Sequence, residues 1–439
     1  MFERIALHNF RSFENLEFDL SDRSGTPKHL AIIFGDNGIG KTNLAFAFNF
    51  LSETLHTMDV RDIMQSIFNA TPDAISNERL SKIIHSRYRD LETIIKENKL
   101  VESEDSMKLD FYFKIAGKRG RYILETNDQQ IIHEQLEYTL SQNKGVYFEI
   151  TPENCSINPK IFTDKKTLKE ILSAHEKYWG KHSLLSIILH EIADKADLLV
   201  KAKLSEHFQT IINFMTKLSI KSNLNGIKQY NRINLLDDIV GDVSSGNIPA
   251  SKERILNKIE DLLNHFFPQI NNDIVKVFYT KTYKEDKIIY QLHIAKRIAQ
   301  KVRNLDFSME SSGTKSLLYL LPYMLKATAG VVVVIDEFDI GLHDALTNSL
   351  IESLSPILSG QLIITTHGTQ IMKNNALKDN IYIIQNDDDG TKRINCITYY
   401  DKKIAPNTNI RNQYFDGKYG SLPQAPSIDF KPMIALLNH

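Results

Sequence analysis

The sequence has 439 residues, of which 42% are hydrophobic and 24% charged, and its net charge at pH 7 is -1. This length predicts two or three domains, or one core with large insertions, and the balanced charge excludes polyanion binding through overall charge alone. Two cysteines are too few for a disulfide framework, and no apolar run is long enough to span a bilayer. We therefore expect a soluble cytoplasmic protein.

The first sixty residues predict three strands and a helix. Apolar residues alternate with polar ones from Ile5 to Phe10, and the alternation returns at 16–20 after a polar turn, which favours two strands. Residues 30–34 (LAIIF) are a continuous apolar run of strand length. The spacing then becomes helical, with one apolar face made by Leu44, Ala45, Phe48 and Leu51.

The run GDNGIGKTN at 35–43 joins the third strand to the helix. It matches G-x-x-x-x-G-K-[ST], in which glycines let backbone amides approach phosphate oxygens and the helix N-terminus faces the anion. Lys41 is expected to neutralise phosphate charge, and Thr42 to give its hydroxyl to Mg²⁺. A chance glycine turn is the alternative, which the flanking strand and helix disfavour. The run thus predicts an ATP and Mg²⁺ site with these nucleotide-binding residues: Asn37, Gly38, Gly40, Lys41, Thr42 and Asn43.

The middle of the chain shows no recognisable chemistry. Residues 58–105 are polar and indicate helices and loops, whereas three runs in 107–150 indicate an antiparallel β lobe. Residues 163–220 and 251–267 have helical spacing around a break at 222–250, and a hairpin follows across KEDK. We predict three units: an ATPase core from 1–57 and 305–439, a β lobe with connecting helices at 58–162, and a helical insertion ending in a β-hairpin at 163–304.

The last third of the chain alternates helices and strands. Residues 331–335 and 361–365 are apolar and rich in β-branched residues, and a helix with apolar residues from Leu346 to Leu354 lies between them. Such alternation predicts a parallel sheet. The fold class expected is therefore α/β, with both ends of the chain building the core.

Acidic residues follow the first of these strands, and a histidine follows the second. Asp336 is placed to hold Mg²⁺, and Glu337 to orient or deprotonate the attacking water. A helix N-cap with a solvated neighbour is the alternative for this pair. His367 lies at the carboxyl end of a parallel strand, where ligands bind, and is a candidate γ-phosphate sensor, although a lone histidine is more often structural.

A second small-residue turn, Ser311-Ser312-Gly313-Thr314-Lys315, opens an apolar helix. Its amides and hydroxyls form a possible second anion site, and a plain N-cap is the alternative. One nucleotide does not need two such helix starts from the same subunit.

Taken together, the motifs NFRSF, GDNGIGKTN, ESSGTKSLL, DEFDIGLH and TTHG, in that order, resemble those of ABC-type ATPases of the RecF, SMC and OLD group. The resemblance implies an ABC-type ATPase head in which ATP is sandwiched between two copies. It implies that residues from Ser311 to Lys315 are the signature contacting the other copy's γ-phosphate, with Glu310 and Ser312 departing from the usual LSGGQ. By the same resemblance Arg11 reaches the nucleotide and Asp339 lies in the D-loop, whereas no Q-loop glutamine can be placed.

The insertion lacks long heptads, and the tail ITYYDKKIAPNTNIRNQYFDGKYGSLP resembles RloA/AbiL-like phage-defence ATPases, kin of the PARIS and Septu ATPase subunits. This implies a homo-oligomer that responds to a phage protein and controls a separate effector such as a nuclease. Too few residues follow His367 for a Toprim nuclease, and the acids at 387–389 are expected in a hairpin turn rather than a metal site.

Two other functions stay open. A RecF-like or SMC-like DNA-repair ATPase would clamp DNA, and basic stretches at 118–121 and 296–303 are candidate contacts, although charge runs are usually solvated faces. A scaffold that binds ATP without hydrolysing it is the third class, which Glu337 disfavours.

Overall fold

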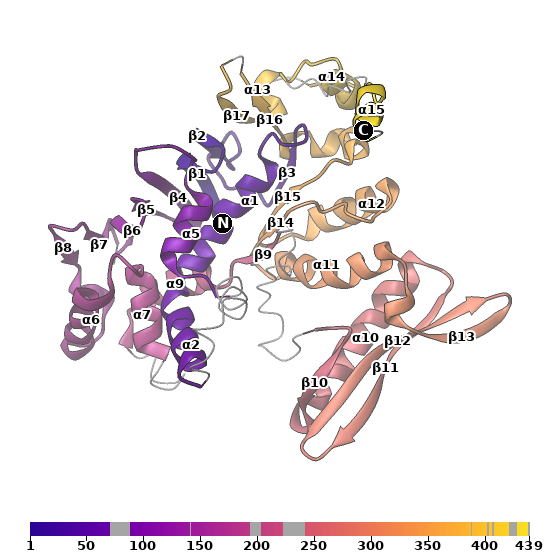
Figure 1. The fold of residues 1–439 in the computed structure, drawn as a ribbon, viewed down its shortest axis with the longest axis horizontal. Helices are drawn as coiled ribbons and strands as arrows, with labels where there is room; N and C mark the ends of the chain where they lie inside the picture. The colour runs from indigo at the N-terminus through magenta and orange to yellow at the C-terminus, as the bar shows by residue number, and fades with distance from the viewer. Residues whose placement is uncertain are drawn as a thin grey trace.

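The computed structural model describes residues 1–70, 88–140, 142–193, 203–222, 242–387, 389–401, 404–405, 408–420 and 428–437. Within these residues the strands form three sheets of seven, six and four strands. Figure 1 shows an N-terminal β lobe with its helices on one side, a central sheet, and an arm that projects away from both. The expected α/β class is confirmed.

The central six-stranded sheet unites both ends of the chain. Its order is β17 (Lys392–Cys396), β16 (Ile381–Asn386), β3 (Leu30–Phe34), β15 (Gln361–Thr365), β14 (Val332–Ile335) and β9 (Ser219–Lys221). All neighbours pair in parallel except β16 and β17. The parallel sheet predicted from the spacing is thus confirmed. The expected hairpin around 387–389 is also present, although residue 388 lies outside the described residues.

Helices cover both faces of this sheet. Alternate strand residues such as Ile33 and Val334 pack with α1 (Lys41–Thr54). Their neighbours Phe34 and Ile335 pack with α11 (Ser312–Thr328) and α12 (Asp344–Leu354). Because successive side chains of a strand point to opposite faces, α1 and α11 lie on opposite sides of the sheet (Figure 1).

The antiparallel sheet crosses the boundary that we predicted after residue 57. Its order is β2 (Phe13–Asp19), β1 (Phe2–Phe10), β4 (Met107–Ile115), β5 (Lys118–Thr126), β6 (Ile131–Thr139), β7 (Lys144–Ile150) and β8 (Cys155–Ile157). β1, from the predicted core, pairs with β4 of the predicted lobe along its length. The segment that precedes the phosphate loop is therefore held by the β lobe.

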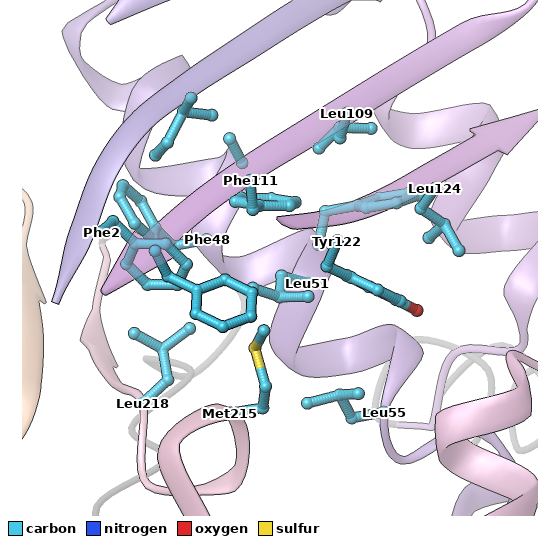
Figure 2. Packing of buried hydrophobic residues seen from close by; sticks show 14 of the residues in the cluster. Phe2, Phe48, Leu51, Leu55, Leu109, Phe111, Tyr122, Leu124, Met215 and Leu218 are labelled. Atoms are coloured by element: carbon cyan, nitrogen blue, oxygen red, sulfur yellow. The ribbon is translucent and has the colours of Figure 1, made fainter. Parts of the chain in front are cut away.

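Helix α1 is buried between the two sheets. Figure 2 shows Phe48 and Leu51 of α1 against Phe2 and Phe111 of the antiparallel sheet. The rings of Phe2 and Phe48 lie 5.3 Å apart. The predicted apolar face is present, but Phe46 and other residues outside it are also buried, because sheets cover α1 from two sides.

The other helices of the N-terminal part pack around this lobe. They are α2 (Thr57–Ala70), α5 (Leu91–Asn98), α6 (Lys165–Tyr178), α7 (Leu184–Ala193) and α9 (Glu206–Thr216). Helices α6, α7 and α9 fall where residues 163–220 were predicted helical. The chain then enters β9, so the predicted insertion contributes a strand to the central sheet.

The arm is a four-stranded sheet on one helix. It comprises β10 (Ser245–Pro249), α10 (Glu253–Ile270), β11 (Ile274–Lys284), β12 (Lys287–Ile298) and β13 (Lys301–Asp306). The predicted hairpin across KEDK is confirmed by the pairing of Lys284 with Lys287. The predicted break at 222–250 lies mainly outside the described residues, apart from β10 and its flanks.

Short helices end the chain: α13 (Ile397–Tyr400), α14 (Ile410–Phe415) and α15 (Lys431–Leu437). In the part of the chain that the structure describes, no helix combines the length and the apolar character needed to cross a membrane.

Candidate active site

The loop between β3 and α1 requires glycine where it meets the β1–β2 turn. Gly40 has a φ of 117°, and a Cβ there would lie 3.0 Å from the Phe13 ring. Gly38 has a φ of 77° with open space around it. A side chain at Gly40 would therefore strain the backbone and push the phosphate loop off the β lobe.

Lys41 lies inside this loop. Its ammonium donates to the carbonyl oxygens of Gly35 at 2.7 Å and Asp36 at 2.9 Å, and the residue is only 6% exposed. Burial lowers the pKa of Lys41, while the nearby carboxylates, Asp336 foremost, act in the opposite direction. A lysine inside a loop at a helix N-terminus suits a phosphate group, because the amides and the ammonium both attract an anion.

Asp336 directly follows β14, Thr365 ends the neighbouring β15, and the two residues are hydrogen bonded. Ile335 pairs with Ile364 across β14 and β15, so the next residues of both strands meet. The Thr365 hydroxyl donates to Asp336 Oδ1 at 2.5 Å and accepts from the Glu337 amide at 2.8 Å. Thr365 thereby fixes both the Asp336 carboxylate and the backbone of the next residue.

Thr42 and Asp336, the two predicted Mg²⁺ ligands, are brought together. Burial raises the pKa of Asp336, and hydrogen bonds to the hydroxyls of Thr365 and Thr42 partly oppose that rise. A hydroxyl and a carboxylate are hard oxygen donors of the kind that Mg²⁺ prefers. The donor set therefore fits the metal.

The chain turns sharply at Glu337, whose φ of 53° is rare for a non-glycine residue. Its side chain is half-buried, and its carboxylate acts on the pKa of Lys41. Asp339 accepts a 3.1 Å hydrogen bond from the His367 amide, and the His367 side chain is exposed. The loops after β14 and β15 are thus tied together, with His367 at their outer edge.

Arg11 is held on α1 from the β lobe. Its guanidinium lies 3.7 Å from the centre of the Phe46 ring, and its amide donates to the Asn98 carbonyl at 2.6 Å. Asn43 donates to the Ser12 hydroxyl at 2.6 Å. These contacts place both predicted nucleotide-binding residues beside the first turns of α1.

The signature residues are not brought to this site. Ser311 caps α11 by accepting from the Thr314 amide at 3.2 Å, and Ser311 and Ser312 are exposed. Since α1 and α11 pack on opposite faces of the sheet, the chain's own signature does not complete its own phosphate loop.

Gly313 is needed for packing within the chain. A Cβ on Gly313 would lie 2.5 Å from the carbonyl oxygen of Gly341. Glycine is needed at this position because the start of α11 packs directly on the backbone after β14.

Two residues at the site were missed from the sequence. Thr365 could have been found from the sequence, because it is a polar residue at the end of an apolar strand. Lys221 could not have been found, because β9 has only three residues and no motif surrounds it. Its burial beside Asp336 follows only from strand pairing.

A known protein family matches most of the chain. The family described as "AAA domain, putative AbiEii toxin, Type IV TA system" matches residues 30–373. None of the curated proteins compared with the sequence matches it.

Solved structures with a similar fold include three SMC heads. An SMC head bound to the C-terminal winged-helix domain of ScpA is 15% identical, with 90% of this chain and 96% of that chain covered and a TM-score of 0.45. The SMC head from Thermotoga maritima is 14% identical, with 90% and 98% covered and a TM-score of 0.37. An SMC head with an extended coiled coil, bound to the C-terminal domain of ScpA derived from Pyrococcus furiosus, is 14% identical, with 90% and 95% covered and a TM-score of 0.40.

Proposed function

From its membership of the family of AAA domains described as a putative AbiEii toxin of a type IV TA system, we propose that this chain is the ATPase subunit of a bacterial antiphage defence system. The chain is a P-loop ATPase. ATP is sandwiched between the heads of a homo-oligomer that senses infection. The assembly restrains or triggers a separate effector, such as a nuclease, in the cytoplasm.

One observation supports an ATP site shared between two copies of the chain. The signature turn at 311–315 begins with two exposed residues, Ser311 and Ser312, and its helix lies across the sheet from the helix that follows the chain's own phosphate loop. A helix start with free amides attracts an anion, and a second copy is the simplest source of the phosphate. We infer that each site combines the phosphate loop of one copy with the signature of another.

Within one copy, the residues divide the chemistry. Lys41 and the loop amides bind phosphate oxygens, and Arg11 adds a further positive charge beside α1. Thr42 and Asp336 would hold Mg²⁺, which supplies positive charge against the phosphates. Glu337 accepts a proton from the attacking water, and His367 contacts the terminal phosphate from the edge of the site.

The shared site is tested by the mass of the purified protein in solution. Glu337→Gln with ATP and Mg²⁺ should form a dimer or larger assembly, because nucleotide bound between heads is no longer hydrolysed. The same protein with ADP, and a Lys41→Ala/Glu337→Gln double variant with ATP, serve as controls. If the mass in solution is the same in all three samples, the result would contradict a site in which ATP is bound between two copies.

The defence role rests on the family's description as a toxin system and on the resemblance of the tail. The test is a phage challenge of cells that carry the gene with its neighbours. Protection should be lost with Lys41→Ala in this chain, and separately with the neighbouring effector gene removed. Protection by this chain alone would contradict a separate effector.

A DNA-clamping repair ATPase is the second candidate, and the arm favours it. Arg297, Lys301 and Arg303 lie exposed on the β12–β13 hairpin. The hairpin leads directly into the signature helix. Duplex DNA binding that requires ATP and weakens steeply with salt would support this function, and equal binding by a variant with all three residues changed to glutamine would oppose it.

A further inference from the structure

A lysine that no motif marks lies at the same sheet edge as the catalytic acids. β9 is the neighbour of β14, and Lys221 pairs with Ile335 in parallel register. The Lys221 carbonyl accepts from the Asp336 amide at 2.8 Å. Lys221 therefore ends β9 beside Asp336, which directly follows β14, at the edge where parallel sheets bind ligands.

Its environment is unusual for a lysine. Lys221 is 2% exposed, and the next residue, Ser222, is fully buried. Within the described part of the chain the Ser222 hydroxyl has no hydrogen-bond partner. Buried lysines are rare unless they are paired, and buried hydroxyls normally find a partner. A buried cation beside an unpartnered hydroxyl indicates a place for a polar ligand.

The charges around Lys221 connect it to the catalytic pair. Burial lowers the pKa of Lys221, and the carboxylates of Asp336 and Glu337 act in the opposite direction. The same two carboxylates act on Lys41. Asp36 and Asp339 also act on Lys41. Two buried lysines therefore share Asp336 and Glu337.

The order of the strands decides which part of a nucleotide Lys221 would reach. The strands run β3, β15, β14, β9 from the phosphate loop outward. At about 4.8 Å between strands, β9 lies on the order of 14 Å from β3. Lys41 and Asp336 lie close together at the phosphate loop, and β9 is the neighbour of β14. The part of a nucleotide nearest to β9 would therefore be its phosphates.

We propose that Lys221 binds the terminal phosphate of ATP, with the Ser222 hydroxyl beside it. Without nucleotide, Lys221 is a counter-ion for Asp336 and Glu337. With nucleotide, it contacts a γ-phosphate oxygen and separates ATP from ADP. This inference rests on the ATP site alone and needs neither the oligomer nor the defence role.

The test measures affinity rather than turnover. Lys221→Met removes the charge and keeps the length of the side chain. The dissociation constants of Mg²⁺–AMP-PNP and Mg²⁺–ADP are measured by calorimetry on the purified protein. AMP-PNP should bind about tenfold more weakly, as expected for one charge-assisted hydrogen bond, while ADP changes less than about twofold. Lys221→Arg should retain part of the preference for AMP-PNP.

Lys326→Met is the matched control. Lys326 is also a buried lysine and donates to Ser219 Oγ, at the other end of β9, at 3.4 Å. Its loss should change neither affinity. Equal weakening of both nucleotides by Lys221→Met, or no change in either, would overturn the proposal. If Lys221→Met does not fold, Lys221→Gln replaces it, and failure of both to fold would mean that Lys221 serves the fold.

Discussion

Replacing Ser312 by aspartate should move stability and activity in opposite directions. Ser312 is the first residue of α11, is exposed, and begins a helix with no acidic residue in its first turn. A negative charge there interacts favourably with the helix dipole and should stabilise the single chain by about 0.3–1 kcal/mol. The melting temperature should therefore stay the same or rise slightly.

Between two copies the same charge is unfavourable. A carboxylate about 6 Å from one phosphate charge, at an effective dielectric constant of about 20, is repelled by roughly 3 kcal/mol. That energy corresponds to about a hundredfold loss of ATP-dependent association. Binding of ATP to each single chain should be unchanged, because the phosphate loop on the other face of the sheet is untouched.

Mixing subunits gives the most demanding assay. Lys41→Ala and Ser312→Asp proteins are each expected to be inactive as ATPases, since every shared site then carries one lesion. A mixed dimer has one site with both lesions and one with neither, so mixing should restore part of the hydrolysis. Ser251→Asp, which adds the same charge at an exposed position before α10, should leave activity unchanged. A mixture that stays inactive despite proven subunit exchange, or a fully active Ser312→Asp protein, would refute the shared site.

Four further changes test individual contacts. Lys41→Ala should abolish ATP binding in calorimetry, because the site loses the ammonium that meets the phosphates. Glu337→Gln should keep ATP binding but lower hydrolysis by about a hundredfold or more in single-turnover assays, and a rate near that of the natural protein would place the base elsewhere. Gly313→Ala should destabilise the protein by about 1–3 kcal/mol in thermal unfolding, since its Cβ would lie 2.5 Å from the Gly341 carbonyl oxygen; a stable Gly313→Ala protein would show that the two segments separate easily. Burial raises the pKa of Glu134 to about 7, so between the unfolded pKa near 4.5 and pH 7 the folded state binds a proton that the unfolded state does not. The contribution of Glu134 to stability is therefore greatest at low pH and is lost as the pH rises through 7. In thermal unfolding, the stability of the natural protein relative to Glu134→Gln should increase from pH 8 to pH 5, and a difference independent of pH would contradict the raised pKa.

Local sequence patterns determined much of the core. The phosphate loop, the strands at 30–34 and 361–365, and the helix that begins at Lys41 follow from consecutive residues, because each depends on the backbone and side chains of a few neighbours. The start of α11 was also readable, since a serine cap acts within one turn.

Other features depend on residues far apart in the chain. β6 was missed because Glu134 occupies an inward-facing position in it, where four donors satisfy the carboxylate: the hydroxyl of Tyr122, the indole of Trp179, and the amides of Leu184 and Leu185. The alternation of apolar and polar residues that predicts a strand does not predict an acidic residue on its buried face. The double-sided burial of α1 likewise required the second sheet.

The site itself shows the same division. The sequence identified Lys41, Asp336 and Glu337 because each stands in a motif. Lys221 stands in none, and it meets Asp336 only because β9 pairs with β14. A strand of three residues has too little pattern to predict its partner, so tertiary pairing alone placed this second lysine beside the acids that also act on Lys41.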